Sequence, residues 1–486
     1  MKPWSRREKT MFAICCAVPL ALAGFGALYA WLNRVPQTPI THLPLPAVNA
    51  FDVHAQALTN YVAWGAKTPL DAHLDPFVKE ECHFGSPSYN RRYPPALKQV
   101  FLRRNARAFA LFRKALTLPY VQPPERKGRR VAPHPQYREF ARALLVEAHA
   151  HAQSESWDKA ADSLMDILRF GHQTPRGGPF IASLSSIGSR AEALRDFHIV
   201  LPHISVAKSR ECIRELEKLH ASRITTAEAL SEEKWAEQGI ISYLTQTDGW
   251  VSVYGVSPQL SLFTKAQLRW MNKARLLREN ARCLDWQIAQ AKKPYVPDNF
   301  RRDAPWPFPT PYGGPETDQV KAIVYPQFTR SPLTFLLQET KESLFISLLA
   351  LRAFKLEQGR YPTTLQELTP RYLSRVPLDP FSVKPLRYQL RPVRFITRQW
   401  MEVFLLPGQV ALPDRPLSPE QVREHKSFGT MPFALYSVGF DARDDGGIPW
   451  SDLQNATGKL RHRANLKMFD AFLNGQKADI VAGINL

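Results

Sequence analysis

The sequence LFISLLALRAFKLEQ (residues 344–358) runs into GRYPTTLQEL (359–368), RVPLDPFSVKPLRYQL (375–390) and FALYSVGFDARDDGG (433–447). The helix predicted for Lys341–Gln358 has a heavily apolar side, and charged residues such as Lys341 and Glu342 interrupt it near its ends. Those charges make it too polar for a membrane span, so we expect it to pack on a sheet. Gly359 suits the C-terminal cap, because glycine readily adopts left-handed backbone.

Strand patterns follow this helix. The segments Leu386–Thr397, Met401–Leu406 and Ala434–Val438 predict three strands. Residues 407–432 are expected to form an insertion loop between the second and the third. The last part of the chain is therefore predicted to be a small α+β domain, in which one helix packs on an antiparallel sheet.

An acidic loop follows the last predicted strand. It holds Asp441, Asp444 and Asp445 between glycines, with Asp452 a little beyond. Closely spaced carboxylates on tight backbone suit a hard cation, which takes several oxygen ligands. Ca²⁺ is the natural candidate outside the cytoplasm, and an acidic turn without an ion is the alternative.

The ordered series of residues in this part of the chain resembles the globular domain of the type II secretion major (G-type) pseudopilins. The likeness covers Thr340–Asp452 and rests on LRAFKLEQGRYPTTLQEL, Pro377, Asp379-Pro380-Phe381, Tyr388, Tyr436-Ser437-Val438-Gly439, Asp441 and Gly446-Gly447. In that family the loop after the last strand binds calcium. The resemblance therefore implies calcium ligands here, with Asp441 and Asp452 matching best and Asp444 and Asp445 less closely.

Other parts of the chain depart from that family. Some 310 residues separate the first apolar segment from the pseudopilin-like region, and the N-terminal KTMFAICCAVPL lacks the Gly-Phe…Glu processing signature. We therefore do not expect the chain to be processed and polymerised as a pilin. The whole layout resembles uncharacterised membrane-anchored proteins of planctomycete-type bacteria, a likeness that implies architecture and no activity.

The N-terminal segment predicts a membrane anchor. Basic residues in 1–10 precede the uncharged apolar run Met11–Leu32, which is long enough to cross a bilayer as a helix. Basic flanks remain in the cytoplasm, so the bulk of the chain is expected outside the cytoplasmic membrane as a single-pass protein. A cleaved signal peptide is the alternative, although its apolar region is usually shorter.

Between the anchor and the pseudopilin-like region, helical spacing of apolar residues predicts an array of helices. The fold class is thus mostly α, with a small α+β domain at the end. The predicted parts are a cytoplasmic N-terminus (1–10), a transmembrane helix (11–32), a Pro-rich stalk (33–50), an α-helical extracytoplasmic domain (51–292), a Pro-rich linker (293–327), the pseudopilin-like domain (328–454) and a C-terminal tail (455–486).

The chain is strongly basic, with a net charge of +20 over 486 residues. The window 91–130 holds twelve Lys or Arg and one acid, Glu125. Such a block suits anionic lipid or an anionic polymer, and a solvated helix face is the alternative. Nucleic acid is disfavoured, because no basic motif interleaved with aromatics is present and the position is extracytoplasmic.

Motifs of common enzymes are absent from the sequence: there is no GxSxG, HExxH, Walker A or strand-linked GxGxxG. Thr225 and Glu228 form a predicted capping box. The acids of that helix (Glu228, Glu232, Glu233 and Glu237) are expected on a solvated face, and paired carboxylates that bind a metal or act as acid and base are the alternative. The sequence therefore favours a non-enzymatic envelope protein that binds partner proteins, linked to a secretion-like assembly. The alternatives are a cell-envelope enzyme with its site in the helical domain, and anionic polymer or lipid binding through 91–130.

Overall fold

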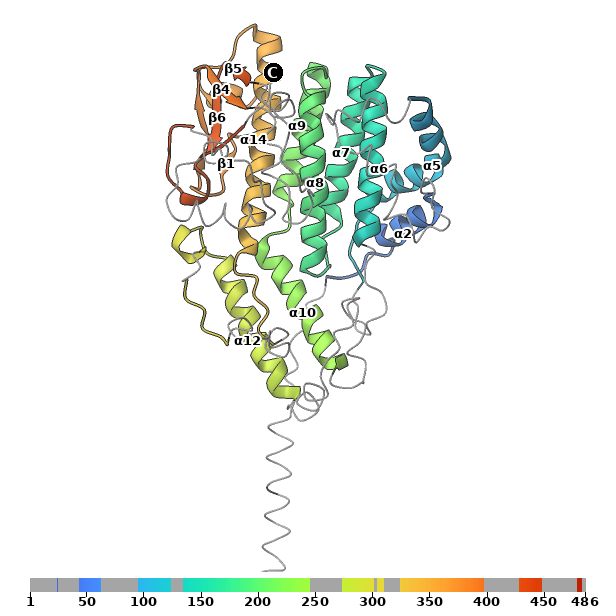
Figure 1. Ribbon diagram of the computed structural model, residues 1–486, viewed down its shortest axis with the longest axis vertical. Coiled ribbons are helices and arrows are strands. Elements are labelled where there is room, and N and C mark those ends of the chain that lie inside the picture. The colour runs from blue at the N-terminus through green and yellow to red at the C-terminus, as the bar shows by residue number, and fades with distance from the viewer. Residues whose placement is uncertain are drawn as a thin grey trace, which may run out of the picture.

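The fold is mostly helical, with a small antiparallel sheet near the C-terminus, as the sequence predicts (Figure 1). The computed structural model describes Gly24 and residues 43–62, 95–123, 134–244, 273–300, 304–309, 324–396, 428–447 and 479–482. Within these ranges it has nine α-helices, namely α2 (Ala50–Asn60), α5 (Pro95–Leu116), α6 (His134–Gln153), α7 (Trp157–Gln173), α8 (Phe180–Val200), α9 (Val206–Ala221), α10 (Thr226–Leu244), α12 (Lys273–Ala291) and α14 (Ser331–Gln358).

The helices form one layered body. Helices α6, α7, α8, α9 and α14 stand next to one another, α2 pairs with α5 at one edge, and α10 pairs with α12 below (Figure 1). Helix α14 packs against α8 and α9 on one side and contacts strands β1 and β6 on the other. The helix that the sequence placed at the start of the pseudopilin-like domain therefore also belongs to the helical body.

Local sequence explains several helix ends. The Oγ of Ser205 accepts a hydrogen bond from the Lys208 amide at 3.0 Å and caps α9. The predicted capping box before α10 is confirmed, because the Thr225 amide donates to Glu228 and the Glu228 amide donates to Thr225. Gly359 ends α14 in the left-handed conformation with φ of 70°.

The described residues also form seven short strands. They are β1 (Leu378–Asp379), β2 (Lys384–Pro385), β3 (Arg387–Gln389), β4 (Val393–Ile396), β5 (Phe428–Met431), β6 (Ala434–Ser437) and β7 (Ile480–Val481). Strands β3, β6 and β7 form one sheet in that order, while β1 pairs with β2 and β4 with β5, all antiparallel. Three 3₁₀ turns accompany them, η2 (Pro297–Phe300), η3 (Leu365–Leu368) and η4 (Gly439–Asp441).

The strands differ in detail from those predicted. The predicted strand Leu386–Thr397 is interrupted, so that it forms β3 and β4. Strand β5 lies in the region predicted as an insertion loop, and β7 lies in the region predicted as a tail. The predicted strand Met401–Leu406 lies outside the described residues. A boundary at residue 454 therefore excludes a strand that belongs to the sheet.

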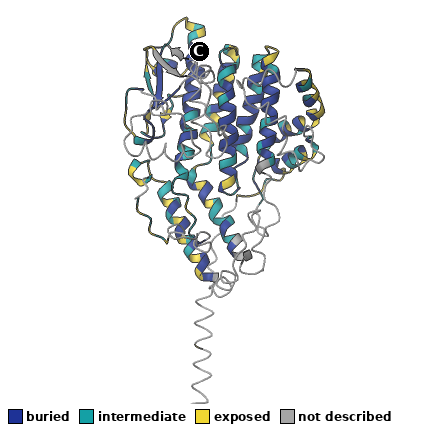
Figure 2. Cartoon of the chain, in the orientation of Figure 1, coloured by how far each residue is buried: buried dark blue, intermediate teal, exposed yellow. Residues whose placement is uncertain are grey.

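One hydrophobic core runs from the helices into the sheet (Figure 2). It includes Phe140 of α6, Phe197 of α8, Phe345 of α14 and Tyr436 of β6. Full burial of one such side chain contributes about 1.5–3 kcal/mol. Because α14 supplies buried residues along most of its length, it joins the two parts of the protein.

The predicted transmembrane helix 11–32 falls outside the described residues, apart from Gly24. Among the helices that the structure describes, none is both long enough and apolar enough to cross a bilayer.

Candidate functional site

The acidic loop predicted to bind calcium follows β6 and the turn η4. The Asp441 carboxylate accepts a hydrogen bond from the Arg443 amide at 3.1 Å. Asp444 is bonded to Arg387 at 3.0 Å and to the Tyr436 hydroxyl at 3.0 Å, so its charge already has partners. Asp445, which follows Asp444, has one buried carboxylate oxygen, Oδ2, without a hydrogen-bond partner.

A fourth acid, Asp479, joins this loop from the end of the chain. Its carboxylate accepts hydrogen bonds from the amides of Asp445 at 3.3 Å and Gly447 at 2.6 Å. Burial, with a further contribution from the charges of Asp445 and Asp444, raises the pKa of Asp479 to about 6. The apolar residues Ile480–Ala482 that follow Asp479 are the sequence signal for this position, which lies in the region predicted as a tail.

The structure thus places Asp445 close both to Asp441 and to Asp479. Burial raises the pKa of Asp441 as well, and the nearby Asp445 charge adds to that shift. Mutual repulsion together with an unpartnered oxygen is the condition that a hard cation relieves. Asp452, the remaining predicted ligand, lies outside the described residues.

A preformed metal centre would need at least three ligand side chains already arranged around one point. Across the described parts of the chain, no group of three or more His, Cys, Asp or Glu side chains is arranged to hold a metal ion. The donor set around Asp445 therefore fits a cation by its chemistry, whereas its geometry is not that of a complete coordination shell.

A second set of hydrogen bonds, around Asp379, connects the β1–β2 hairpin to strand β6. Asp379 at the end of β1 is 1% exposed. It accepts hydrogen bonds from the Ser437 hydroxyl at 2.7 Å and the Val438 amide at 3.0 Å, and also from the Phe381 amide at 3.0 Å. One buried carboxylate therefore ties the β1–β2 hairpin to the end of β6, directly before the acidic loop.

The helical body holds a buried carboxylate cluster around Glu342 of α14, which is 1% exposed. Glu342 Oε1 accepts from Arg190 of α8 at 2.7 Å and from Gln338 at 3.1 Å. Its Oε2 lies 3.3 Å from His172 Nε2 of α7 and 3.3 Å from His220 Nδ1 of α9. We call these five residues the Glu342 cluster, which joins four helices. Burial would raise the pKa of Glu342, but the charge of Arg190 and the contacts with His172 and His220 hold it well below the usual value, so the carboxylate is charged.

A glycine makes room for this cluster. A Cβ at Gly171 of α7 would lie 2.3 Å from Cγ of Arg190. Ser186 of α8 also donates to the Gly171 carbonyl. The close approach of α7 and α8 therefore lets the Arg190 side chain pass between the helices toward Glu342.

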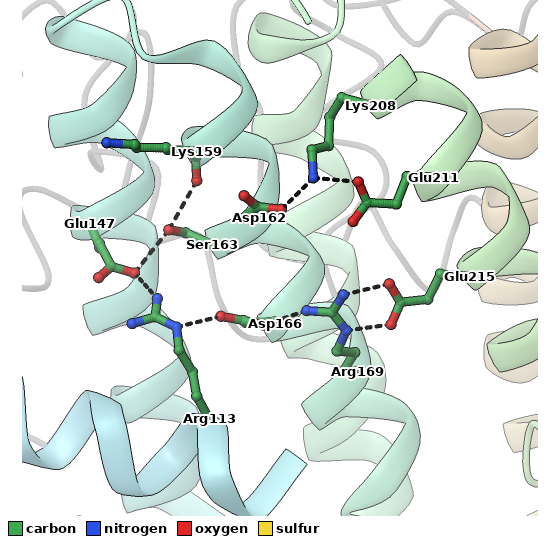
Figure 3. A network of polar contacts seen from close by, with 10 residues as sticks. All are labelled: Arg113, Glu147, Lys159, Asp162, Ser163, Asp166, Arg169, Lys208, Glu211 and Glu215. Carbon is green, nitrogen blue, oxygen red and sulfur yellow. Dashed lines mark hydrogen bonds and ion pairs between the residues drawn. The ribbon is translucent and has the colours of Figure 1, made fainter. Parts of the chain in front are cut away.

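A chain of alternating charges links α5, α6, α7 and α9 (Figure 3). Arg113 of α5 bridges Glu147 of α6 and, at 2.8 Å, Asp166 of α7. Arg169 then connects Asp166 to Glu215 of α9. Asp166 and Glu147 are largely buried, whereas Arg113, Arg169 and Glu215 are partly exposed. Paired charges therefore connect these helices at the edge of the core.

Helices α6 and α8 are joined in the same manner. His149 contacts Asp196 at 2.8 Å, and both side chains are fully buried. Glu192 accepts from Arg138 at 3.0 Å and from Arg142 at 3.1 Å. The polar residues of this interface therefore serve helix packing.

The acids of α10 were predicted to lie on a solvated face, and this prediction was wrong for two of them. Glu237 is 5% exposed, and its carboxyl group is hydrogen-bonded to that of Glu233. Glu233 also accepts from the Phe180 amide at 2.6 Å. Helix α8 begins after Pro179, which has no capping side chain, so Glu233 takes the role of a cap.

No family model, no curated protein and no solved structure matches this chain.

Proposed function

We propose that the protein is a non-enzymatic, single-pass membrane protein of the envelope that presents its C-terminal α+β unit to a partner protein, within or beside a secretion-like assembly. The observation that carries this proposal is the shared helix α14. It packs on α8 and α9 and also on β1 and β6, so the unit is held against the helical body. Because the α+β unit is already held against the helical body, it loses little orientational freedom when it binds a partner.

The β1–β2 hairpin offers a contact surface for such a partner. Leu378 is 48% exposed and Val383 is 63% exposed, although both side chains are apolar. Val383 also has a φ of 55°, which is strained for a β-branched residue. The Val383 amide donates to the Asp379 carbonyl at 2.8 Å, so the hairpin maintains this conformation. Strain combined with apolar exposure is typical of residues that contact a partner.

Calcium is proposed as a ligand of the acidic loop, with Asp441, Asp445 and Asp479 as donors together with Asp452. The unpartnered Asp445 oxygen and the raised pKa values of Asp441 and Asp479 support it. Asp444 is assigned to Arg387 and Tyr436 instead. A cation here would fix the loop beside the sheet and would therefore stabilise the presented unit.

The experiment that tests partner binding is site-specific photo-cross-linking in intact cells. A photoreactive amino acid is placed at position 383 or 378, and at 356 as the matched control, since Leu356 is 53% exposed but lies on α14 outside the hairpin. We expect one discrete protein adduct from 383 and 378, identified by mass spectrometry. Equal adduct patterns at all three positions, or none at 383 and 378, would remove the support for the hairpin as a binding surface.

A further inference from the structure

Helix α5 has the most one-sided charge of the described helices, with six Lys or Arg side chains and no acid. The structure separates these cations into two groups. Lys98 is buried, and Arg113 turns inward to Glu147 and Asp166. The other four side chains are exposed: Arg103, Arg104, Arg107 and Lys114.

Three of the four exposed cations lie along one line. At about 100° per residue, positions 103, 107 and 114 fall within about 40° of one another around the helix axis. They span about 16 Å along α5 at about 1.5 Å per residue. Ala106 and Ala110, also exposed, lie beside them and allow a ligand to approach the helix closely. Arg104 lies beside this line, about 60–100° around the axis from it. We call Arg103, Arg107 and Lys114, together with the adjacent Arg104, the cationic stripe.

The cationic stripe has no balancing acid in the part of the chain that the structure describes. Its four members form no ion pair there. The neighbouring helix α2 contributes one acid, Asp52. A row of unbalanced guanidinium groups attracts a ligand with repeated negative charges, because each arginine can bind a carboxylate in a bidentate manner.

We propose that the cationic stripe binds a linear anionic polysaccharide that carries carboxylate groups, an inference that rests on the proposed extracytoplasmic position. An extended sugar chain matches a narrow stripe lined by alanines. A lipid surface is a poorer match, because Val100 is the one large apolar side chain exposed on α5 and no aromatic is exposed there to enter a bilayer. A nucleic acid would lack aromatic side chains on which to stack its bases.

The test measures binding of a fluorescent oligogalacturonate to the full chain in phosphatidylcholine nanodiscs at several salt concentrations. The variant R103E/R107E is compared with K292E/K293E, which makes the same change in net charge at two exposed lysines at and just beyond the end of α12. R103Q/R107Q is a milder second variant, and circular dichroism verifies that each variant is folded. We expect R103E/R107E to weaken binding at least about tenfold, and K292E/K293E to leave it within about twofold of the parent, a ΔΔG near 0.4 kcal/mol.

We also expect the slope of log affinity against log salt to decrease in R103E/R107E and R103Q/R107Q, because fewer counterions are released. Equal losses of affinity in R103E/R107E and K292E/K293E would show that binding depends on the overall net charge and not on the cationic stripe. Tighter binding of oligothymidylate, or of phosphatidylglycerol nanodiscs, through the same arginines would overturn the polysaccharide assignment. This assay uses purified protein, so its outcome is independent of whether position 383 cross-links to a partner.

Discussion

Arg190 on α8 donates a hydrogen bond to Glu342 on α14 at 2.7 Å, although 152 positions separate the two residues in the sequence. The pair is nearly inaccessible to solvent, with His172 and His220 beside it. The Glu342 cluster therefore fixes the position of α14 in the helical body, and α14 in turn fixes the sheet.

Glu342→Gln is expected to destabilise the protein strongly. The substitution leaves the Arg190 guanidinium buried without a counter-charge, and breaking a buried pair in this way costs about 3–5 kcal/mol. Urea unfolding of the parent and the variant at neutral pH measures the difference.

Asp285→Asn is the matched control, because its ion pair with Lys234 is exposed on the acid side. It should cost about 0–1 kcal/mol. Similar losses for both variants would show that the Glu342 cluster has no special role in stability.

Protonation of His54 should lower stability in acid. Burial lowers its pKa to about 4, against 6.5 in the unfolded chain, although a hydrogen bond with Gln173 opposes the shift. The contribution of His54 is fully present above pH 6.5 and is lost as the pH falls from 6.5 to 4, since the unfolded state then binds the proton. The variant His54→Gln should have a shallower dependence of the free energy of unfolding on pH in this window, by about 1.4 kcal/mol per pH unit. Identical slopes would show that His54 is accessible to protons in the folded protein.

The Glu233–Glu237 pair should give the opposite dependence on pH. Desolvation raises the pKa of Glu233, so its contribution is present below the pKa of an unfolded glutamate and decreases as the pH rises through the folded value. Glu237→Gln supplies a permanent amide donor to Glu233 and should therefore be more stable than the parent at alkaline pH. Parallel stability curves for the two proteins from pH 5 to 9 would contradict a shared proton. An enzyme that used this pair would lose activity in Glu237→Gln without the gain in stability.

Calcium should raise the melting temperature of the parent protein, because a ligand that binds the folded state alone stabilises it by mass action. Asp441→Ala and Asp445→Asn should lose most of this shift, whereas Asp52→Asn, at an exposed acid on α2, should retain it. Melting is followed by circular dichroism in EDTA and in millimolar calcium. If calcium does not change the melting temperature of the parent protein, the acidic loop is a turn held by its own hydrogen bonds and not a calcium site.

Local signals in the sequence predicted local structure well. Gly359 and the Thr225–Glu228 capping box act within a few residues of the helix end that they define. The coarse fold class also followed from helical spacing of apolar residues. These features depend on short-range backbone geometry, which neighbouring residues determine.

Contacts between distant segments were not predictable in this way. Glu342 was interpreted as a charge near the end of a helix, but α14 begins at Ser331, which places Glu342 in its middle and inside the core. Strand β7 is two residues long, too short for an alternating pattern, and Asp479 beside it was missed for that reason. Spacing on α10 shows which acids share a face, but only packing against α8 shows that Glu233 meets the Phe180 amide.

The central claim is that α14 holds the β1–β2 hairpin in a fixed position relative to the helical body, from which it meets a partner. Pulsed electron spin resonance between labels at the exposed positions Lys159 and Val383 tests this most directly, with Lys159 and Ile181 as a reference pair inside the helical body. The account predicts a single distance population for 159–383 that is about as narrow as the one for 159–181. A broad or divided distribution for 159–383 beside a narrow reference would contradict it.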